Sequence, residues 1–406
     1  MIAGIVLAAA ASAEAQAPAP MRPPAPTAAP QELLDEAREL LVVGACADGT
    51  SAKIKPEIYA AHCKTVRAAQ DDYKKQWLAP ATEFFKANVP AGLPKTVVYP
   101  FAGGDLSTAL AVYPDADEIT TISLEPAGDP RALGRLSEKE LKAALPTVST
   151  ELSALYRHNY SKTMDMISAM TGARLPTQLI FGLSALWMHG YELTGMRYFT
   201  LTPEGDVRYL TAEDTRRIDA IGNLGKRNRE YSNVELRFRR AGGREQIYRH
   251  LLANLDDAHL KSEPATLAHL EKKGRIAAMT KAASYLLTFD NFKTMRKLII
   301  DHVEWMVSDS TGLAPKYGTA AGFEYEVWGA YDVSNMDEGK WITPQWVALY
   351  AAQPKRPLKF RFGYPSGGPK YTPHLIIMRK AKTPPAAAPA AAPAPSKPAP
   401  SKPAKP

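Results

Sequence analysis

Two carboxylic acids and a pair of glycines are the residues of this sequence whose types and spacing best suit chemistry. Gly103, Gly104 and Asp105 follow the apolar run Thr96–Tyr99, and Glu125 ends the next apolar run about twenty residues later. Glycines let backbone N–H groups approach a ligand, a helix N-terminus favours an anion, and an acid at this spacing can accept the hydroxyls of a ribose. We therefore predict a ligand-binding cleft lined by Tyr99, Gly103, Gly104, Asp105 and Glu125.

The same residues leave other interpretations open. Asp105 and Glu125, at the ends of neighbouring strands, could act as paired carboxylates in acid–base catalysis or hold a cation. The spacing is also closer to the first motif of class I methyltransferases, which use S-adenosylmethionine, than to GxGxxG, although Gly-Gly-Asp is not the full glycine pattern. Alternatively, the glycines only form a tight turn and Glu125 pairs with a neighbouring base.

Weaker candidates lie in the second half of the chain. Lys281, Ser284 and Tyr285 fall on neighbouring positions of a predicted helix, where a lysine can activate a hydroxyl, although such groups are common by chance. Asp309 lies in the polar turn 308–312, which could coordinate a cation or cap a helix. The eight histidines are scattered, and HExxH, GxSxG, Walker and CxxC motifs are absent. No metal site and no cofactor are predicted.

The elements that would position these residues form an α/β pattern. A strand over 96–99, a Gly-rich turn, a helix over 106–112 and a strand over 118–124 indicate the opening βαβ unit of a Rossmann-like, methyltransferase-like core. Before it lies a helical segment over 31–94, whose second helix we expect to break or kink at Pro80. The rest of a single α/β domain over 95–380 is β-rich.

Periodicity assigns the remaining elements of that domain. Helices are predicted over 137–171, 267–287 and 292–307, and 176–187 fits either a strand or a buried helix. Strands are predicted over 191–201, 207–210, 233–240 and 246–255, with short ones at 329–331, 358–364 and 374–378.

The two cysteines, Cys46 and Cys63, fit one disulfide if the protein is exported, and otherwise two buried thiols. Export is indicated by residues 1–15, an Ala-rich apolar run that ends in an A-x-A cleavage pattern, although no Lys or Arg precedes it. The alternative is an Ala-rich disordered arm. No apolar run is long enough for a transmembrane helix.

Proline-rich segments flank the predicted folded region. Residues 16–30 form a Pro/Ala linker, and residues 381–406 form a disordered Pro/Ala/Lys tail. The tail's lysines could contact anionic wall polymers or membrane surfaces, or the tail could simply solubilise the protein. These lysines account for part of the net charge of +8. Because that part lies in the tail and not in the folded region, the charge is weak evidence for nucleic-acid binding, and no nucleic-acid partner is predicted.

Several short blocks resemble an uncharacterised family of bacterial envelope proteins and predicted lipoproteins. The blocks are Tyr99-Pro100-Phe101 with Gly104-Asp105, Leu124-Glu125-Pro126-x-Gly128, Lys281-x-x-Ser284-Tyr285-Leu286, Phe292-x-x-x-Arg296, Asp309-Ser310-Thr311-Gly312-Leu313, Gly329-x-Tyr331 and Gly363-Tyr364. They span roughly 95–380, without a match over 135–240, and the lipobox cysteine of the lipoprotein-type members is missing. The resemblance implies an envelope location and a single integrated domain, and it supplies no catalytic residues.

Together these observations predict an exported protein of the periplasm or cell envelope. We expect a ligand-binding module for a small molecule, a glycan or a peptide, with its cleft at the ends of the first two strands. The alternatives are a periplasmic enzyme that uses Asp105 and Glu125, and an S-adenosylmethionine-dependent methyltransferase-like protein.

Overall fold

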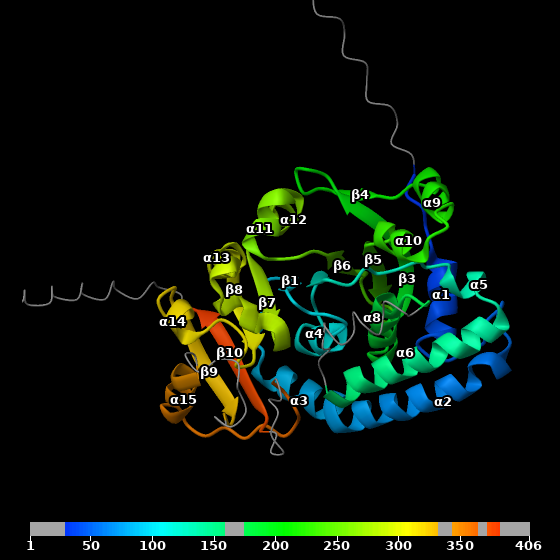
Figure 1. Ribbon diagram of the computed structural model, residues 1–406. Coiled ribbons are helices and arrows are strands. Elements are labelled where there is room, and N and C mark those ends of the chain that lie inside the picture. Colours follow the sequence, from blue (N-terminus) through cyan, green and yellow to red (C-terminus); the bar gives the residue numbers. More distant parts are fainter. Residues whose placement is uncertain (1–28, 159–173, 332–342, 364–371, 382–406) are drawn as a thin grey trace, which may run out of the picture.

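The computed structural model describes residues 29–158, 174–331, 343–363 and 372–381 (Figure 1). These residues form a mixed α/β structure of which about 46% is helical. The predicted signal peptide, nearly all of the predicted linker and the tail from residue 382 lie outside the described residues. None of the described helices combines the length and the apolar composition that crossing a membrane requires.

Ten strands form one mixed sheet in the order β4-β3-β5-β6-β2-β1-β7-β8-β10-β9. They are β1 (Thr96–Tyr99), β2 (Glu118–Ser123), β3 (Glu192–Leu201), β4 (Val207–Tyr209), β5 (Asn233–Arg239), β6 (Gln246–Leu252), β7 (Ile276–Thr280), β8 (Val303–Ser308), β9 (Phe323–Gly329) and β10 (His374–Lys380). The central strands β6, β2, β1, β7 and β8 pair in parallel, and antiparallel strands flank them on both sides.

Helices cover both faces of this sheet (Figure 1). Val97 and Tyr99 of β1 belong to one apolar core, shared with α1, α2, α4, α6 and α8, whereas Val98 belongs to a second core, shared with α11, α12 and α13. This division follows from the alternation of side chains along a strand. The α-helices of the described residues are α1 (Leu34–Val43), α2 (Pro56–Tyr73), α3 (Ala79–Asn88), α4 (Leu106–Val112), α5 (Ala132–Arg135), α6 (Glu138–His158), α8 (Thr177–Met188), α9 (Ala212–Asp219), α10 (Leu224–Glu230), α11 (Asp257–Ser262), α12 (Pro264–Glu271), α13 (Lys293–His302), α14 (Pro315–Gly318) and α15 (Thr343–Ala351).

The predicted strand–helix–strand unit is present, because β1 and β2 pair in parallel with α4 between them. Asp105 begins α4 as its N-cap and accepts a hydrogen bond from the backbone N–H of Thr108. Such a cap satisfies one of the free N–H groups of a first helical turn. On its other side β1 pairs with β7, a strand from far along the chain.

The predicted break at Pro80 takes a milder form. A π-helix over Lys74–Leu78 joins α2 to α3, and Pro80 lies in the first turn of α3. A proline ring clashes with the turn before it, and a locally widened turn relieves that clash while the helical path continues. The helical rod therefore runs from residue 56 to residue 88.

Two predicted helices and two predicted strands are wrong. One of these strands is 329–331, since β9 ends at Gly329. The segment 267–287 contains the end of α12, the strand β7 and a 3₁₀ helix over Ala282–Thr288, and the segment 292–307 contains α13 followed by β8. β7 is buried along its whole length, so its apolar run shows no alternation, and periodicity cannot distinguish such a strand from a helix. Residues 358–363 form no strand, although Phe360 and Phe362 pack in the core.

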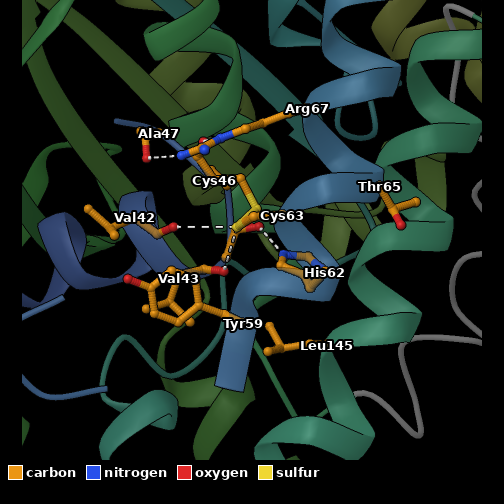
Figure 2. Close-up of a disulfide and its surroundings, with 12 residues drawn as sticks. Val42, Val43, Cys46, Ala47, Tyr59, His62, Cys63, Thr65, Arg67 and Leu145 are labelled. Atoms are coloured by element: carbon orange, nitrogen blue, oxygen red, sulfur yellow. Dashed lines mark hydrogen bonds between the residues drawn. A yellow bond between two sulfur atoms is a disulfide. The ribbon is translucent and has the colours of Figure 1, made fainter. Parts of the chain in front are cut away.

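A disulfide between Cys46 and Cys63 links the loop after α1 to α2 (Figure 2). The neighbouring His62 side chain adds two polar contacts, because Nδ1 lies 2.6 Å from Ser149 Oγ of α6 and Nε2 lies 2.9 Å from the Gly44 carbonyl oxygen. The disulfide and the imidazole together hold α1, α2 and α6 against one another.

Candidate functional site

The carboxyl ends of β1, β7 and β8 meet at one edge of the sheet, called here the carboxyl edge. Because β1 has β2 on one side and β7 on the other, the chain connections diverge at this point, where open α/β sheets usually bind ligands. Phe101 and Ala282, just beyond β1 and β7, are non-glycine residues with φ of 57° and 58°. Such backbone geometry is costly and is often found at functional sites.

Asp105 and Lys281 form a buried ion pair at the centre of this edge. Lys281 Nζ lies 2.6 Å from Asp105 Oδ2 and 3.2 Å from Thr108 Oγ1, and the Tyr99 hydroxyl donates to the same Asp105 oxygen at 3.1 Å. Thr108 supplies two further donors, its backbone N–H and its hydroxyl, to Asp105 Oδ1. A carboxylate has about four acceptor positions, so the protein itself occupies the hydrogen-bonding capacity of Asp105.

The glycine turn is already filled by the protein. Gly103 has φ of 53°, and its carbonyl oxygen accepts a hydrogen bond from Gln178 Nε2. A Cβ atom at Gly104 would lie 2.1 Å from the Phe181 ring of α8. The space that a glycine opens for a ligand in nucleotide-binding turns is here occupied by an aromatic ring, so Gly104 has a packing role.

Glu125 has the opposite environment to Asp105. It is only 3% exposed, and neither carboxylate oxygen forms a hydrogen bond with the described residues. Gln178 Oε1 is likewise buried and unpartnered. His250 connects these two residues, because its Nε2 lies 2.8 Å from the Glu125 carbonyl oxygen and its Nδ1 lies 3.3 Å from Gln178 Nε2. Burial raises the pKa of the Glu125 carboxyl above its ordinary value, and the polar groups of Ser123 and of the local backbone oppose this effect only in part.

Asp309 follows β8, rather than the helix predicted before it, and stabilises the turns of the carboxyl edge. Its Oδ1 accepts hydrogen bonds from the backbone N–H and the hydroxyl of Thr311, and its Oδ2 accepts one from the backbone N–H of Ala282 at 3.2 Å. This carboxylate therefore ties the turn after β8 to the turn after β7.

The other weak candidates separate into different environments. Lys281 ends an extended segment, and Ser284 and Tyr285 lie on a 3₁₀ helix, so the predicted common helix is wrong. The Ser284 hydroxyl donates to the Lys281 carbonyl oxygen at 3.2 Å and not to the amine. The Tyr285 ring packs edge-on against Phe289. Lys281 is the one of these three whose side chain contacts Asp105 in the hydrogen bonds described above.

A cavity of about 730 Å³, called here the aromatic cavity, lies beside the carboxyl edge. Tyr73, Trp77, Tyr156 and Phe360 supply aromatic rings to its lining. Tyr73 and Trp77 stack with ring centroids 5.1 Å apart, on the stretch where α2 passes into the π-helix. Its charged lining residues are the cations Arg157, Lys359 and Arg361 and the single acid Asp72. These residues come from three distant segments, and none of them was a predicted site residue.

Tyr73 connects the aromatic cavity to the polar centre. Its hydroxyl donates to Ser107 Oγ at 3.1 Å, and Ser107 lies in the first turn of α4, next to Thr108. Burial, and then the nearby Asp105 carboxylate, raise the pKa of Tyr73 well above its ordinary value, so the hydroxyl remains a donor. The second connection is Phe362, one residue beyond the cavity lining, whose ring lies 5.3 Å from Lys281 Nζ.

Within the described ranges, one group of possible metal ligands is present, and it lies away from this edge. Cys46, His62 and Cys63 are close enough together to hold an ion, but the two sulfur atoms are bonded to each other (Figure 2). Both ring nitrogens of His62 also have polar contacts within the protein. The group therefore stabilises the helices in this state.

The carboxyl edge thus combines a saturated ion pair, an unpartnered buried acid and an adjoining aromatic cavity. Comparison of the chain with protein-family models, with curated proteins and with solved structures finds no match.

Proposed function

We propose that this chain is an exported bacterial envelope protein that binds a small acidic ligand with a ring, such as an acidic sugar of an envelope glycan. The ligand would occupy the aromatic cavity beside the carboxyl edge of a Rossmann-like sheet. Export is supported by the cleavage pattern in residues 1–15 and by the Cys46–Cys63 disulfide, since disulfides persist in oxidising compartments.

The observation that carries this proposal is the lining of the aromatic cavity. Its volume of about 730 Å³ falls in the range of small-molecule sites. Aromatic faces pack against the apolar faces of rings, and Arg157, Lys359 and Arg361 outnumber the single acid Asp72. Cations beside aromatic walls attract an anion and bind carboxylates through charge-assisted hydrogen bonds.

Titration calorimetry of the full chain with trigalacturonate and with the neutral cellotriose tests this proposal. We expect trigalacturonate to bind and cellotriose to bind much more weakly. Arg157→Gln and Lys359→Gln, both at exposed positions, should each weaken trigalacturonate binding at least about tenfold, the usual effect of losing a hydrogen bond to a charged group.

Lys142→Gln provides the matched control, because Lys142 is an exposed cation of α6, the helix of Arg157, outside the cavity lining. The proposal is contradicted if the two sugars bind equally well, or if Lys142→Gln weakens binding as much as the cavity variants do.

A second candidate function is acid–base catalysis at the end of β2. Glu125 favours it, because a buried carboxyl group with a raised pKa, whose oxygens accept no hydrogen bond from the part of the chain that the structure describes, is suited to proton transfer. The predicted pairing with Asp105 has less support, since Asp105 already accepts hydrogen bonds from Tyr99, Lys281 and Thr108.

A further inference from the structure

A serine and a histidine lie in contact at the carboxyl edge, outside the groups described so far. Ser310 is in the turn after β8, and His374 is the first residue of β10, the antiparallel neighbour of β8. Ser310 Oγ lies 2.8 Å from His374 Nε2, and each residue is 2% exposed.

The other ring nitrogen fixes the direction of this hydrogen bond. His374 Nδ1 lies 3.0 Å from the Thr372 carbonyl oxygen, which can only accept a hydrogen bond. In the neutral imidazole the proton is therefore on Nδ1, and Nε2 accepts the hydrogen bond of the Ser310 hydroxyl. Burial lowers the pKa of His374, with the nearby Asp309 charge as a smaller opposing effect, so the neutral ring is favoured.

Close packing keeps the imidazole in this orientation. Gly363 has φ of 95°, and a Cβ atom there would lie 2.6 Å from His374 Cε1 and Nε2. Tyr331 packs edge-on against the ring at a centroid distance of 5.8 Å. On the serine side, a Cβ atom at Gly312 would overlap Ser308 Oγ at 1.8 Å, so glycine permits the tight turn that carries Ser310.

We propose that Ser310 is a nucleophile activated by His374 and that the pair hydrolyses small carboxylic esters. A base oriented by a third group, here the Thr372 carbonyl, is the common arrangement for activating a serine hydroxyl.

The reaction balances with water as the only co-reactant. Ser310 Oγ attacks the ester carbonyl carbon, and its proton passes to His374 Nε2. The bond to the leaving alcohol then breaks, and the imidazolium returns that proton to the alkoxide. A water molecule, deprotonated by His374 Nε2, next attacks the acyl carbon of the acyl-serine. The bond from this carbon to Ser310 Oγ breaks and releases the carboxylic acid, and the imidazolium returns its proton to Ser310 Oγ. Asp309, whose charge raises the pKa of His374, stabilises the transient imidazolium.

The position of Pro373 indicates the direction of approach. This residue directly precedes His374 and lines the aromatic cavity, so the cavity wall and the serine–histidine pair are adjacent in the chain. Because both side chains are almost fully buried, the acyl group must be small. The proposal does not depend on the acidic ligand proposed for the cavity.

Covalent labelling of the full chain with methanesulfonyl fluoride, a serine reagent as small as the expected acyl group, followed by intact mass and peptide mapping, tests the inference. We expect one methanesulfonyl adduct on Ser310 and turnover of 4-nitrophenyl acetate. Ser310→Ala should abolish both, and His374→Gln should slow both at least about 100-fold, the range for loss of a general base. Ser284→Ala is the matched control, because Ser284 is an equally buried serine that donates to a backbone carbonyl and contacts no base.

The outcomes separate clearly. Loss of the adduct in Ser310→Ala with retention in Ser284→Ala supports the assignment. A folded wild-type chain without an adduct, an adduct at another residue, or labelling that persists in Ser310→Ala overturns it. The wild-type adduct and its dependence on Ser310 decide the question even if His374→Gln fails to fold, which circular dichroism would show.

Discussion

Two acids that follow neighbouring strands differ in how far the protein compensates their charge. Asp105 accepts hydrogen bonds from Lys281, Tyr99 and Thr108, whereas the equally buried Glu125 accepts none from the described residues. An ionised carboxylate without donors in a low-dielectric position destabilises the folded state. Ionised Glu125 therefore lowers the stability of the folded state. Such a cost is typical of a residue that is kept for binding a ligand or transferring a proton.

We expect Glu125→Gln to stabilise the chain at pH 7.5, because the neutral amide replaces a carboxylate whose ionised form burial disfavours. The pKa of Glu125 is raised in the folded state. The contribution of this carboxyl group to stability is therefore fully present below its ordinary pKa of 4.5, where the group is protonated, and is lost as the pH rises through the raised pKa. The gain from the substitution should therefore disappear near pH 4. Urea denaturation at pH 7.5 and pH 4 measures both values.

Two matched variants complete this experiment. Glu204→Gln, at an exposed position, should leave stability nearly unchanged at both pH values. Asp105→Asn should have the opposite sign and cost about 3–5 kcal/mol, because it leaves the Lys281 ammonium buried and unpaired. If Glu125→Gln destabilises the chain at pH 7.5 as Asp105→Asn does, Glu125 has a structural partner.

At the scale of elements, the sequence predicts a helix or strand correctly where its hydrophobic pattern, its turn residues and its capping residues all indicate the same element. The β1–α4–β2 unit was predicted because a β-type run, glycines, an Asp cap and a second β-type run follow in order within 96–124. β7 was missed because Ile276–Thr280 is buried on both sides and lacks alternation. Because β7 was not predicted, Lys281 was wrongly assigned to a helix that it would share with Ser284.

The candidate site was only partly predictable for a related reason. Asp105 and Lys281 are 176 residues apart, and Ser310 and His374 are 64 apart. Their contacts follow from sheet order, in which β7 inserts next to β1 and β10 next to β8. Local spacing carries no information about that order, so Asp105 and Lys281 were each named as candidates but their contact was not predicted.

The disulfide links α1 and α2 at the element scale, and its removal tests how much this link contributes. The Cys46→Ala/Cys63→Ala double variant should lose about 3 kcal/mol, the chain-entropy effect of closing a loop of this length. The sequence separation of the two cysteines is 17 residues. Urea denaturation gives the loss, and the wild-type chain in dithiothreitol should show a similar one. Equal stability of the variant and the oxidised wild type would contradict the expectation.

At the scale of the whole molecule, four buried histidines and the half-buried His189 are spread over the structure. Burial lowers the pKa of His189 to about 3 and of His250 and His269 to about 4, and it also lowers those of His62 and His374. Each of these residues has a hydrogen-bonding contact through a ring nitrogen. The folded state therefore holds these rings neutral at pH values where the unfolded chain protonates them.

This arrangement predicts that stability is greatest above pH 6.5 and falls on acidification. A histidine with a lowered folded pKa stabilises the protein above the ordinary value of 6.5, and this contribution is lost as the pH falls toward the folded pKa. Each such histidine should cost roughly 1.4 kcal/mol per pH unit below that value. Urea denaturation at pH 7.5, 6.5, 5.5 and 4.5 measures the slope. His189→Gln, whose amide can replace the contact of Nε2 with Ser107, should reduce the slope by about one proton. An unchanged slope in this variant, or a flat wild-type profile, would show that the histidines titrate equally in both states.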